Sequence, residues 1–103
     1  MVIVIARAGC AAEKRDELVE LARWMQNESR QEPGCIRYAF YVSLEDPTEF
    51  VAVEEWESKE ALETHFQAPS VATFGAKLGD LLDRAPEVNI HVVEQTTGFP
   101  NLD

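Results

Sequence analysis

Four residues of the chain carry side chains that could do acid–base chemistry on a bound molecule. His65 exchanges protons near neutral pH and adjoins an apolar helix face. Glu54 lies inside a hydrophobic segment, where a carboxylate either finds a partner or has a raised pKa. Tyr38 could donate a hydrogen bond to a substrate oxygen, and Arg7 could stabilise an oxyanion. These four are the candidate catalytic residues.

Each candidate also has a structural explanation. Glu54 could form an ion pair with Arg7 or Arg37, and for Glu54 we favour this alternative. His65 could pack against a strand edge, and Tyr38 could make an ordinary buried hydrogen bond. Residue types alone leave these alternatives open.

Apolar side chains near these residues could form the walls of a binding pocket. Trp56 and Phe66 lie at the end of a strand and of the following helix, and Phe74 and Leu78 lie on one stripe of a later helix. Core packing explains a Trp equally well, because its side chain buries a large area. We take these four as the candidate substrate-binding residues.

The sequence lacks the motifs of several enzyme classes. It contains no GxSxG nucleophile elbow and no Gly-rich phosphate loop, so hydrolase and nucleotide-binding functions are not expected. Cys10 and Cys35 do not have the spacing of a zinc site, and we predict free thiols and no bound metal.

Composition predicts a small acidic globular domain. The 103 residues are 46% hydrophobic and 27% charged, which is ordinary for one folded domain. The net charge of −10 disfavours nucleic acid and anionic membranes as partners. No apolar run approaches the roughly 18 residues of a membrane span, and no signal peptide is recognisable, so we expect a cytoplasmic protein.

Hydrophobic periodicity predicts seven elements that position these residues. They are strands at 2–8, 35–43, 49–56 and 88–93, a first helix at 11–31, a short helix before Pro69, and a helix with an apolar stripe from 71 to 82. Ser58 and Ser70 are the predicted N-caps of the two later helices, and Pro33-Gly34 ends the first one. We divide the chain into a domain at 1–95 and a tail at 96–103.

The order of elements predicts an α+β fold of the ferredoxin-like type, βαββααβ, with an antiparallel sheet. The strand at 49–56 is apolar on both faces and therefore needs a cover on both. Helices of the same chain can cover one face. The chain is too short for another layer, so we expect a second copy to cover the other.

Several segments resemble the antibiotic biosynthesis monooxygenase domain over about residues 1 to 95. They are MVIVIARA, EPGCIRY, DPTEFVAVEEWESKEALETHFQAPS and the closing hydrophobic strand. The resemblance implies a dimeric α/β barrel with a pocket between the sheet and the helices of each subunit. It also implies an enzyme that oxidises a small quinol, phenol or polyketide-like substrate with O₂ and uses no cofactor.

Other branches of that family resemble the chain less. The haem-degrading branch has an Asn where Arg7 stands, a Trp where His65 stands, and its axial His near Gly75. The autoinducer-isomerase branch has a His at the position of Ser70. A non-catalytic dimer that binds a small apolar ligand, or serves as an assembly module, is the main alternative to the oxygenase, and haem binding is a third.

Overall fold

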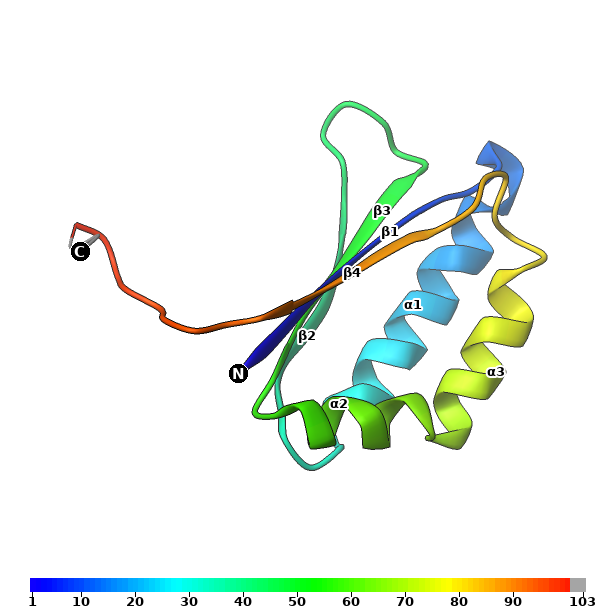
Figure 1. The fold of residues 1–103 in the computed structure, drawn as a ribbon. Helices are drawn as coiled ribbons and strands as arrows, with labels where there is room; N and C mark the ends of the chain where they lie inside the picture. The colour runs from blue at the N-terminus through cyan, green and yellow to red at the C-terminus, as the bar shows by residue number, and fades with distance from the viewer. Residues whose placement is uncertain (101–103) are drawn as a thin grey trace.

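The computed structural model of the protein describes residues 1–100. The elements run in the order β1 (Val2–Gly9), a 3₁₀ turn (Ala12–Lys14), α1 (Arg15–Ser29), β2 (Cys35–Val42), β3 (Glu49–Trp56), α2 (Lys59–Phe66), α3 (Pro69–Leu78) and β4 (Glu87–Val92). Figure 1 shows a sheet whose one face is covered by the helices.

The four strands form one antiparallel sheet in the order β2-β3-β1-β4. The central strands β1 and β3 pair along their whole length, with Val4 opposite Glu54. On their other sides, Ile90 of β4 lies opposite Val4, and Tyr38 of β2 lies opposite Glu54. This sheet with three α-helices confirms the predicted ferredoxin-like α+β fold.

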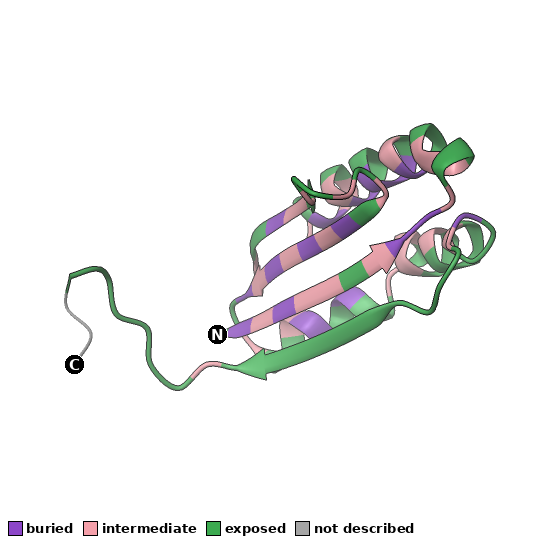
Figure 2. Cartoon of the chain, turned by 90° about the horizontal axis from the view of Figure 1, so that it is seen from above, coloured by how far each residue is buried: buried purple, intermediate pink, exposed green. Residues whose placement is uncertain are grey.

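The core lies between the helices and one face of the sheet. Phe50, Ala52, Glu54 and Trp56 lie at alternate positions of β3 and are all buried. Figure 2 shows this alternation of burial along the central strands. Trp56 is 0% exposed, and Val2, Val4 and Met25 pack in the same cluster. Burying a Trp removes about 150–250 Å² from water, which stabilises the fold by about 4–6 kcal/mol. The two-residue period of β3 therefore places Glu54 inside the core.

The opposite face of the sheet has no cover within residues 1–100. Ile3 and Ile5 of β1 and Val51 and Val53 of β3 alternate onto this face and stay half-buried. All six residues of β4 are exposed, as Figure 2 shows.

The helix boundaries differ from the prediction at three places. The first helix, predicted at 11–31, is a 3₁₀ turn followed by α1. Ser70 is not an N-cap: α3 begins at Pro69, a residue suited to the first helical position, and Ala68 takes the cap position without a side-chain hydrogen bond. The predicted stripe also outlasts the helix, because Leu82 forms a β-bridge with Cys10 after α3 has ended.

After β4 the chain leaves the body of the domain. Figure 1 shows this segment extending away from the sheet, and Phe99 is 94% exposed. Residues 101–103 of the predicted tail lie outside the described residues. None of the helices formed by residues 1–100 combines the length and apolar character that crossing a membrane requires.

Candidate functional site

A cavity of about 220 Å³ lies between the covered face of the sheet and the helices. Its walls come from all four strands and all three helices, and from Pro86 before β4. Its polar lining residues are few: Tyr38, Glu54 and His65, with Arg7 at the border. Phe66 and Val88, which are 48% and 53% exposed, mark where the cavity meets solvent. The sequence signals thus converge on one mostly apolar cavity that contains an acid–base cluster.

His65 enters the cavity from the last turn of α2. Ser58 caps this helix as predicted, because its Oγ accepts a hydrogen bond from the Ala61 N–H at 3.1 Å. The His65 residue is 3% exposed, and its ring centroid lies 4.5 Å from that of Trp56. Its Nδ1 lies 2.8 Å from Oε1 of Glu32.

Glu54 has a different partner from the predicted ones. Trp56 Nε1 donates a hydrogen bond to Glu54 Oε1 at 3.0 Å, and His65 Nε2 lies 4.0 Å from the same oxygen. Burial raises the pKa of the Glu54 carboxyl, while the Trp56 hydrogen bond and the nearby His65 oppose the rise. The prediction of an ion pair between Glu54 and Arg7 or Arg37 is wrong.

The two arginines lie elsewhere. Arg37 contacts Glu55 on the open face at 3.7 Å, with 77% of the arginine side chain exposed. Arg7 borders the cavity but is exposed, and its register partner on β3 is Val51. Val4 is the residue of β1 that lies opposite Glu54, and Arg7 follows it by three positions. Arg7 is therefore about 10 Å further along the strand, and its side chain starts from the opposite face of the sheet. The structure does not bring the Arg7 guanidinium to His65 and Glu54.

Tyr38 lies beside Glu54 on the neighbouring strand and is 4% exposed. Its ring centroid is 5.7 Å from that of His65 and 6.4 Å from that of Trp56. Burial, with the Glu54 charge as the next cause, raises the pKa of the Tyr38 phenol well above its usual range. Tyr38 therefore stays neutral, and its ring lines the cavity while its hydroxyl interacts with the Ser29 side chain.

The four predicted substrate-binding residues separate into two groups. Phe66, Phe74 and Leu78 line the cavity. Trp56 does not, and its fully buried indole reaches the site only through its hydrogen bond to Glu54 and its ring contact with His65. Trp56 is therefore a core residue and not a wall of the cavity, which agrees with the alternative of core packing.

Glu32 is the residue of this cluster that sequence reasoning missed. It precedes Pro33-Gly34 in the turn between α1 and β2, and it is 33 positions from His65. The one sequence signal that could have found it is its place in the EPGC segment, which turns back toward the strand that carries Tyr38.

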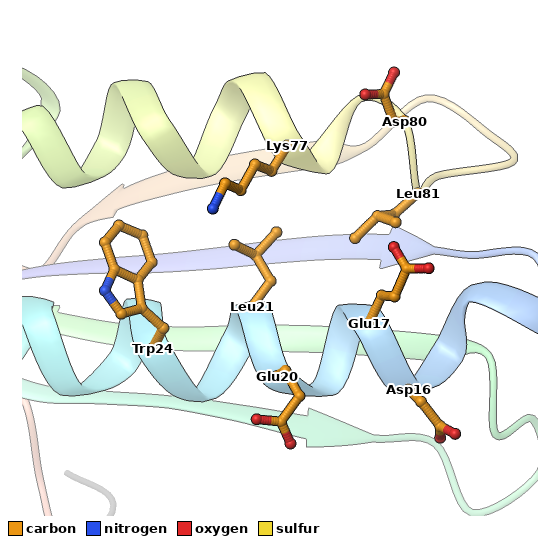
Figure 3. A pocket seen from close by; sticks show the side chains of 8 residues that line it. All are labelled: Asp16, Glu17, Glu20, Leu21, Trp24, Lys77, Asp80 and Leu81. Atoms are coloured by element: carbon orange, nitrogen blue, oxygen red, sulfur yellow. The ribbon is translucent and has the colours of Figure 1, made fainter.

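A second hollow lies between α1 and α3 and contains none of the predicted site residues. Figure 3 shows Leu21 and Leu81 pointing toward each other across this groove, with Asp16 and Glu20 directed away from α3. Trp24 at its side is 36% exposed. Among residues 1–100, no three or more His, Cys, Asp or Glu side chains gather as metal ligands. Cys10 and Cys35 are free thiols, as predicted.

Comparison with known proteins gives consistent matches. The family described as antibiotic biosynthesis monooxygenase matches residues 1–77. An uncharacterized protein of the cyanobacterium Synechocystis is 33% identical over 92% of this chain, which spans 65% of that protein's length. A Mycobacterium tuberculosis protein, named as a candidate monooxygenase, is 35% identical over 86% of this chain and 87% of its own.

Solved structures show the same architecture. The Mycobacterium tuberculosis protein superposes with a TM-score of 0.87 at 31% identity, covering 94% of this chain and 98% of its own. A Methanosarcina mazei protein gives a TM-score of 0.84 at 30% identity over 87% of this chain and 89% of its own. A Deinococcus radiodurans structure, at 24% identity, has a TM-score of 0.92 over 98% of this chain and 100% of its own, and supports the fold alone.

Proposed function

We propose, since the chain belongs to the antibiotic biosynthesis monooxygenase family, that it oxidises a small phenol or quinol with O₂ and without a cofactor. The proposal rests mainly on one observation: His65 Nε2 and Glu54 Oε1 lie 4.0 Å apart in a cavity that is otherwise mostly apolar. A base and a hydrogen-bond donor in a dry cavity are what ionisation of a phenolic hydroxyl requires.

The 4.0 Å separation suits one substrate oxygen. An oxygen about 2.8 Å from His65 Nε2 would also be within hydrogen-bond reach of the Glu54 carboxyl. Nε2 would accept the hydroxyl proton. Burial raises the pKa of the Glu54 carboxyl, and in its protonated form this carboxyl would donate a hydrogen bond to the developing oxyanion. The neutral Tyr38 hydroxyl would be a second donor on turning from Ser29 to the substrate.

The ionised substrate then supplies the electrons itself. One molecule of O₂ takes four electrons from a quinol; one oxygen atom enters the ring as a hydroxyquinone oxygen, and the other leaves as water. The role of the protein in this scheme is to ionise, orient and shield the substrate.

The volume of the cavity limits the size of the substrate. Its roughly 220 Å³ is less than the about 300–1,000 Å³ of sites for drug-sized ligands, and more than the about 150 Å³ that accommodates benzene. One aromatic ring or two fused rings fit this range. We therefore expect mono- and bicyclic quinols to be better substrates than tricyclic anthrones.

The proposed active form is a homodimer located in the cytoplasm. The uncovered sheet face supports the dimer, because Ile3, Ile5, Val51 and Val53 would lose contact with water when a second sheet packs on them. The cytoplasmic location rests on the sequence features given above.

O₂ uptake tests the proposal directly. Purified protein freed of metal and flavin is mixed with one-, two- and three-ring quinols and anthrones, and turnover is compared between the natural protein and His65→Ala. The matched control is His91→Ala, because His91 is exposed on β4 and does not line the cavity; it lies opposite Ile3, so light scattering checks that this variant keeps the oligomeric state of the natural protein. Turnover that is lost in His65→Ala and kept in His91→Ala supports the site. No turnover with any compound, or full activity of His65→Ala, overturns it.

The mostly apolar lining of the cavity also favours the second candidate, a non-catalytic dimer that binds a small apolar ligand. The same compounds would then raise the melting temperature without O₂ uptake, since a ligand that binds only the native state stabilises it.

A further inference from the structure

We infer that Glu32 is a positioning residue: it holds His65 so that Nδ1 carries the hydrogen and Nε2 presents its lone pair to the cavity. The catalytic meaning of this arrangement rests on the proposed function. The arrangement itself concerns one ring and its orientation, and it can be tested without any substrate.

The contact between the two side chains defines the tautomer. Glu32 Oε1 lies 2.8 Å from His65 Nδ1, and the side chains are 20% and 4% exposed. An ionised carboxylate only accepts hydrogen bonds, so Nδ1 must donate. In a neutral imidazole the other nitrogen, Nε2, then has no hydrogen and faces Glu54.

The turn that carries Glu32 is fixed by the backbone on both sides. The Glu32 N–H donates to the Ser29 carbonyl at 3.1 Å, and the Cys35 N–H donates to the Glu32 carbonyl at 3.2 Å. The Glu57 N–H, just before α2, donates to the Gly34 carbonyl at 2.8 Å. The turn is thereby tied to the helix that carries His65.

Gly34 allows the turn to approach α2 closely. It has φ +83°, and a Cβ added to it would lie 2.5 Å from the Cβ of Ala61, four residues before His65. A side chain at this position would push the turn away from the helix. The glycine therefore sets the distance between Glu32 and the imidazole.

Glu32 also matches the charge that forms during the proposed reaction. The substrate O–H bond breaks, an Nε2–H bond forms, and the electron pair stays on the substrate oxygen. The imidazolium so produced donates from Nδ1 to the Glu32 carboxylate in a charge-assisted hydrogen bond. The proton returns to solvent or product when the oxygen departs as water, so the residue is unchanged after each cycle.

Imidazole nitrogen shifts test the orientation in the whole protein. ¹⁵N NMR spectra at neutral pH are recorded for the natural protein, Glu32→Ala and the control Glu57→Ala, which removes an exposed carboxylate that neighbours the same turn. His91→Ala identifies the signals of the one other histidine. We expect the Nδ1–H form to dominate in the natural protein and in Glu57→Ala, and to give way to a mixture in Glu32→Ala. A natural protein with Nε2–H as its main form overturns the inference.

Kinetics test whether the orientation matters for turnover. Removing the group that orients a general base should lower kcat by about 10- to 100-fold and leave KM nearly unchanged, because substrate binding does not involve Glu32. Glu32→Asp keeps the carboxylate and should recover part of the loss. Equal kcat in Glu32→Ala and Glu57→Ala overturns the catalytic half of the inference. If no variant and no natural protein turns over any quinol, the proposed function fails while the NMR result still decides the orientation.

Discussion

Glu54 brings an ionisable group into the core, where burial raises the pKa of its carboxyl above the ordinary 4.5. The native state therefore keeps a proton that the unfolded chain has already released. Stability must fall as pH rises through the window from about 4.5 to the raised native pKa, because there the native state binds more protons.

Glu54→Gln should remove this dependence. The amide keeps an oxygen that can accept the Trp56 N–H, but it does not ionise. Urea unfolding from pH 4 to pH 8 should show the natural protein losing stability relative to the variant as pH rises. Glu55→Gln, on the opposite face of the same strand, should keep the natural pH dependence. Parallel curves for Glu54→Gln and the natural protein would contradict the assignment.

Tyr38→Phe should distinguish the contribution of the ring to stability from the contribution of the hydroxyl to turnover. The ring contacts with Phe40, Trp56 and His65 are preserved, so stability should change by less than about 1 kcal/mol. If the hydroxyl donates to the substrate, kcat should fall by about 10- to 100-fold. The control is Tyr41→Phe, because Tyr41 is 56% exposed on the uncovered face, outside the cavity, and the substitution keeps the ring on which a second sheet would pack. Steady-state kinetics and urea unfolding of both variants measure the two effects.

Sequence reasoning named Tyr38, Glu54 and His65 as candidates without placing them relative to one another, and the structure brings the three to one cavity. It favoured an arginine as the partner of Glu54 and did not consider Trp56, since the strand period gives the face of a side chain and not its distance from a partner. It also missed Glu32, because contact across 33 positions depends on how the turn folds back onto α2.

Among the elements, α2 and the turn before β2 are in close contact at Gly34, whereas Gly75 of α3 has open space around it. No residue of α3 is fully buried, and a Cβ added to Gly75 in this helix would meet nothing within 4 Å. The two glycines therefore have opposite roles: one is required by positive φ and close contact, and the other only weakens a helix.

Alanine substitutions should reveal this difference. Gly34→Ala should destabilise the protein by about 1–3 kcal/mol, because Ala is strained at positive φ and its Cβ meets Ala61. Gly75→Ala should stabilise it by about 0.5–1 kcal/mol through helix propensity. Urea unfolding measures both. Adding Ala61→Gly should recover part of the loss in Gly34→Ala, and no recovery would show that backbone strain alone is responsible.

The elements themselves were predicted in type and order, and their ends less accurately. Strand alternation and the Ser58 cap fixed β3 and the start of α2. Ser70 misled the prediction, because a serine after a proline resembles a cap although Pro69 already occupies the first helical turn. The stripe through Leu81 and Leu82 continued past the end of α3, since these residues pack from the following turn.

At the scale of the whole molecule, one side of the sheet has no cover among residues 1–100. Apolar residues of β1 and β3 on that side, with Tyr41 of β2, form a surface on which a second sheet could pack. The prediction that one chain cannot cover both faces came from β3 alone. Within residues 1–100 the helices cover one face of the sheet only, and the dimer stays a prediction.

Val53→Glu tests the dimer at the middle of the uncovered face. Val53 lies opposite Ile5 on β1 and Ala39 on β2. Light scattering should give a dimer for the natural protein at micromolar concentration and a monomer for Val53→Glu, because a buried unpaired carboxylate is costly. Ala76→Glu, on exposed α3, should stay dimeric. A folded natural monomer at that concentration would refute the assembly.

Trp56 gives the cavity an intrinsic fluorescence reporter. Its indole packs against the His65 imidazole and donates a hydrogen bond to the Glu54 carboxyl, and both of these groups line the cavity. Trp24, the other of the two tryptophans, is partly exposed on α1. In a Trp24→Phe background the emission comes from Trp56 alone, so a molecule that settles against His65 and Glu54 would change its intensity or wavelength. Binding of a molecule in the cavity could then be followed in real time by Trp56 fluorescence, without a label and before any reaction begins.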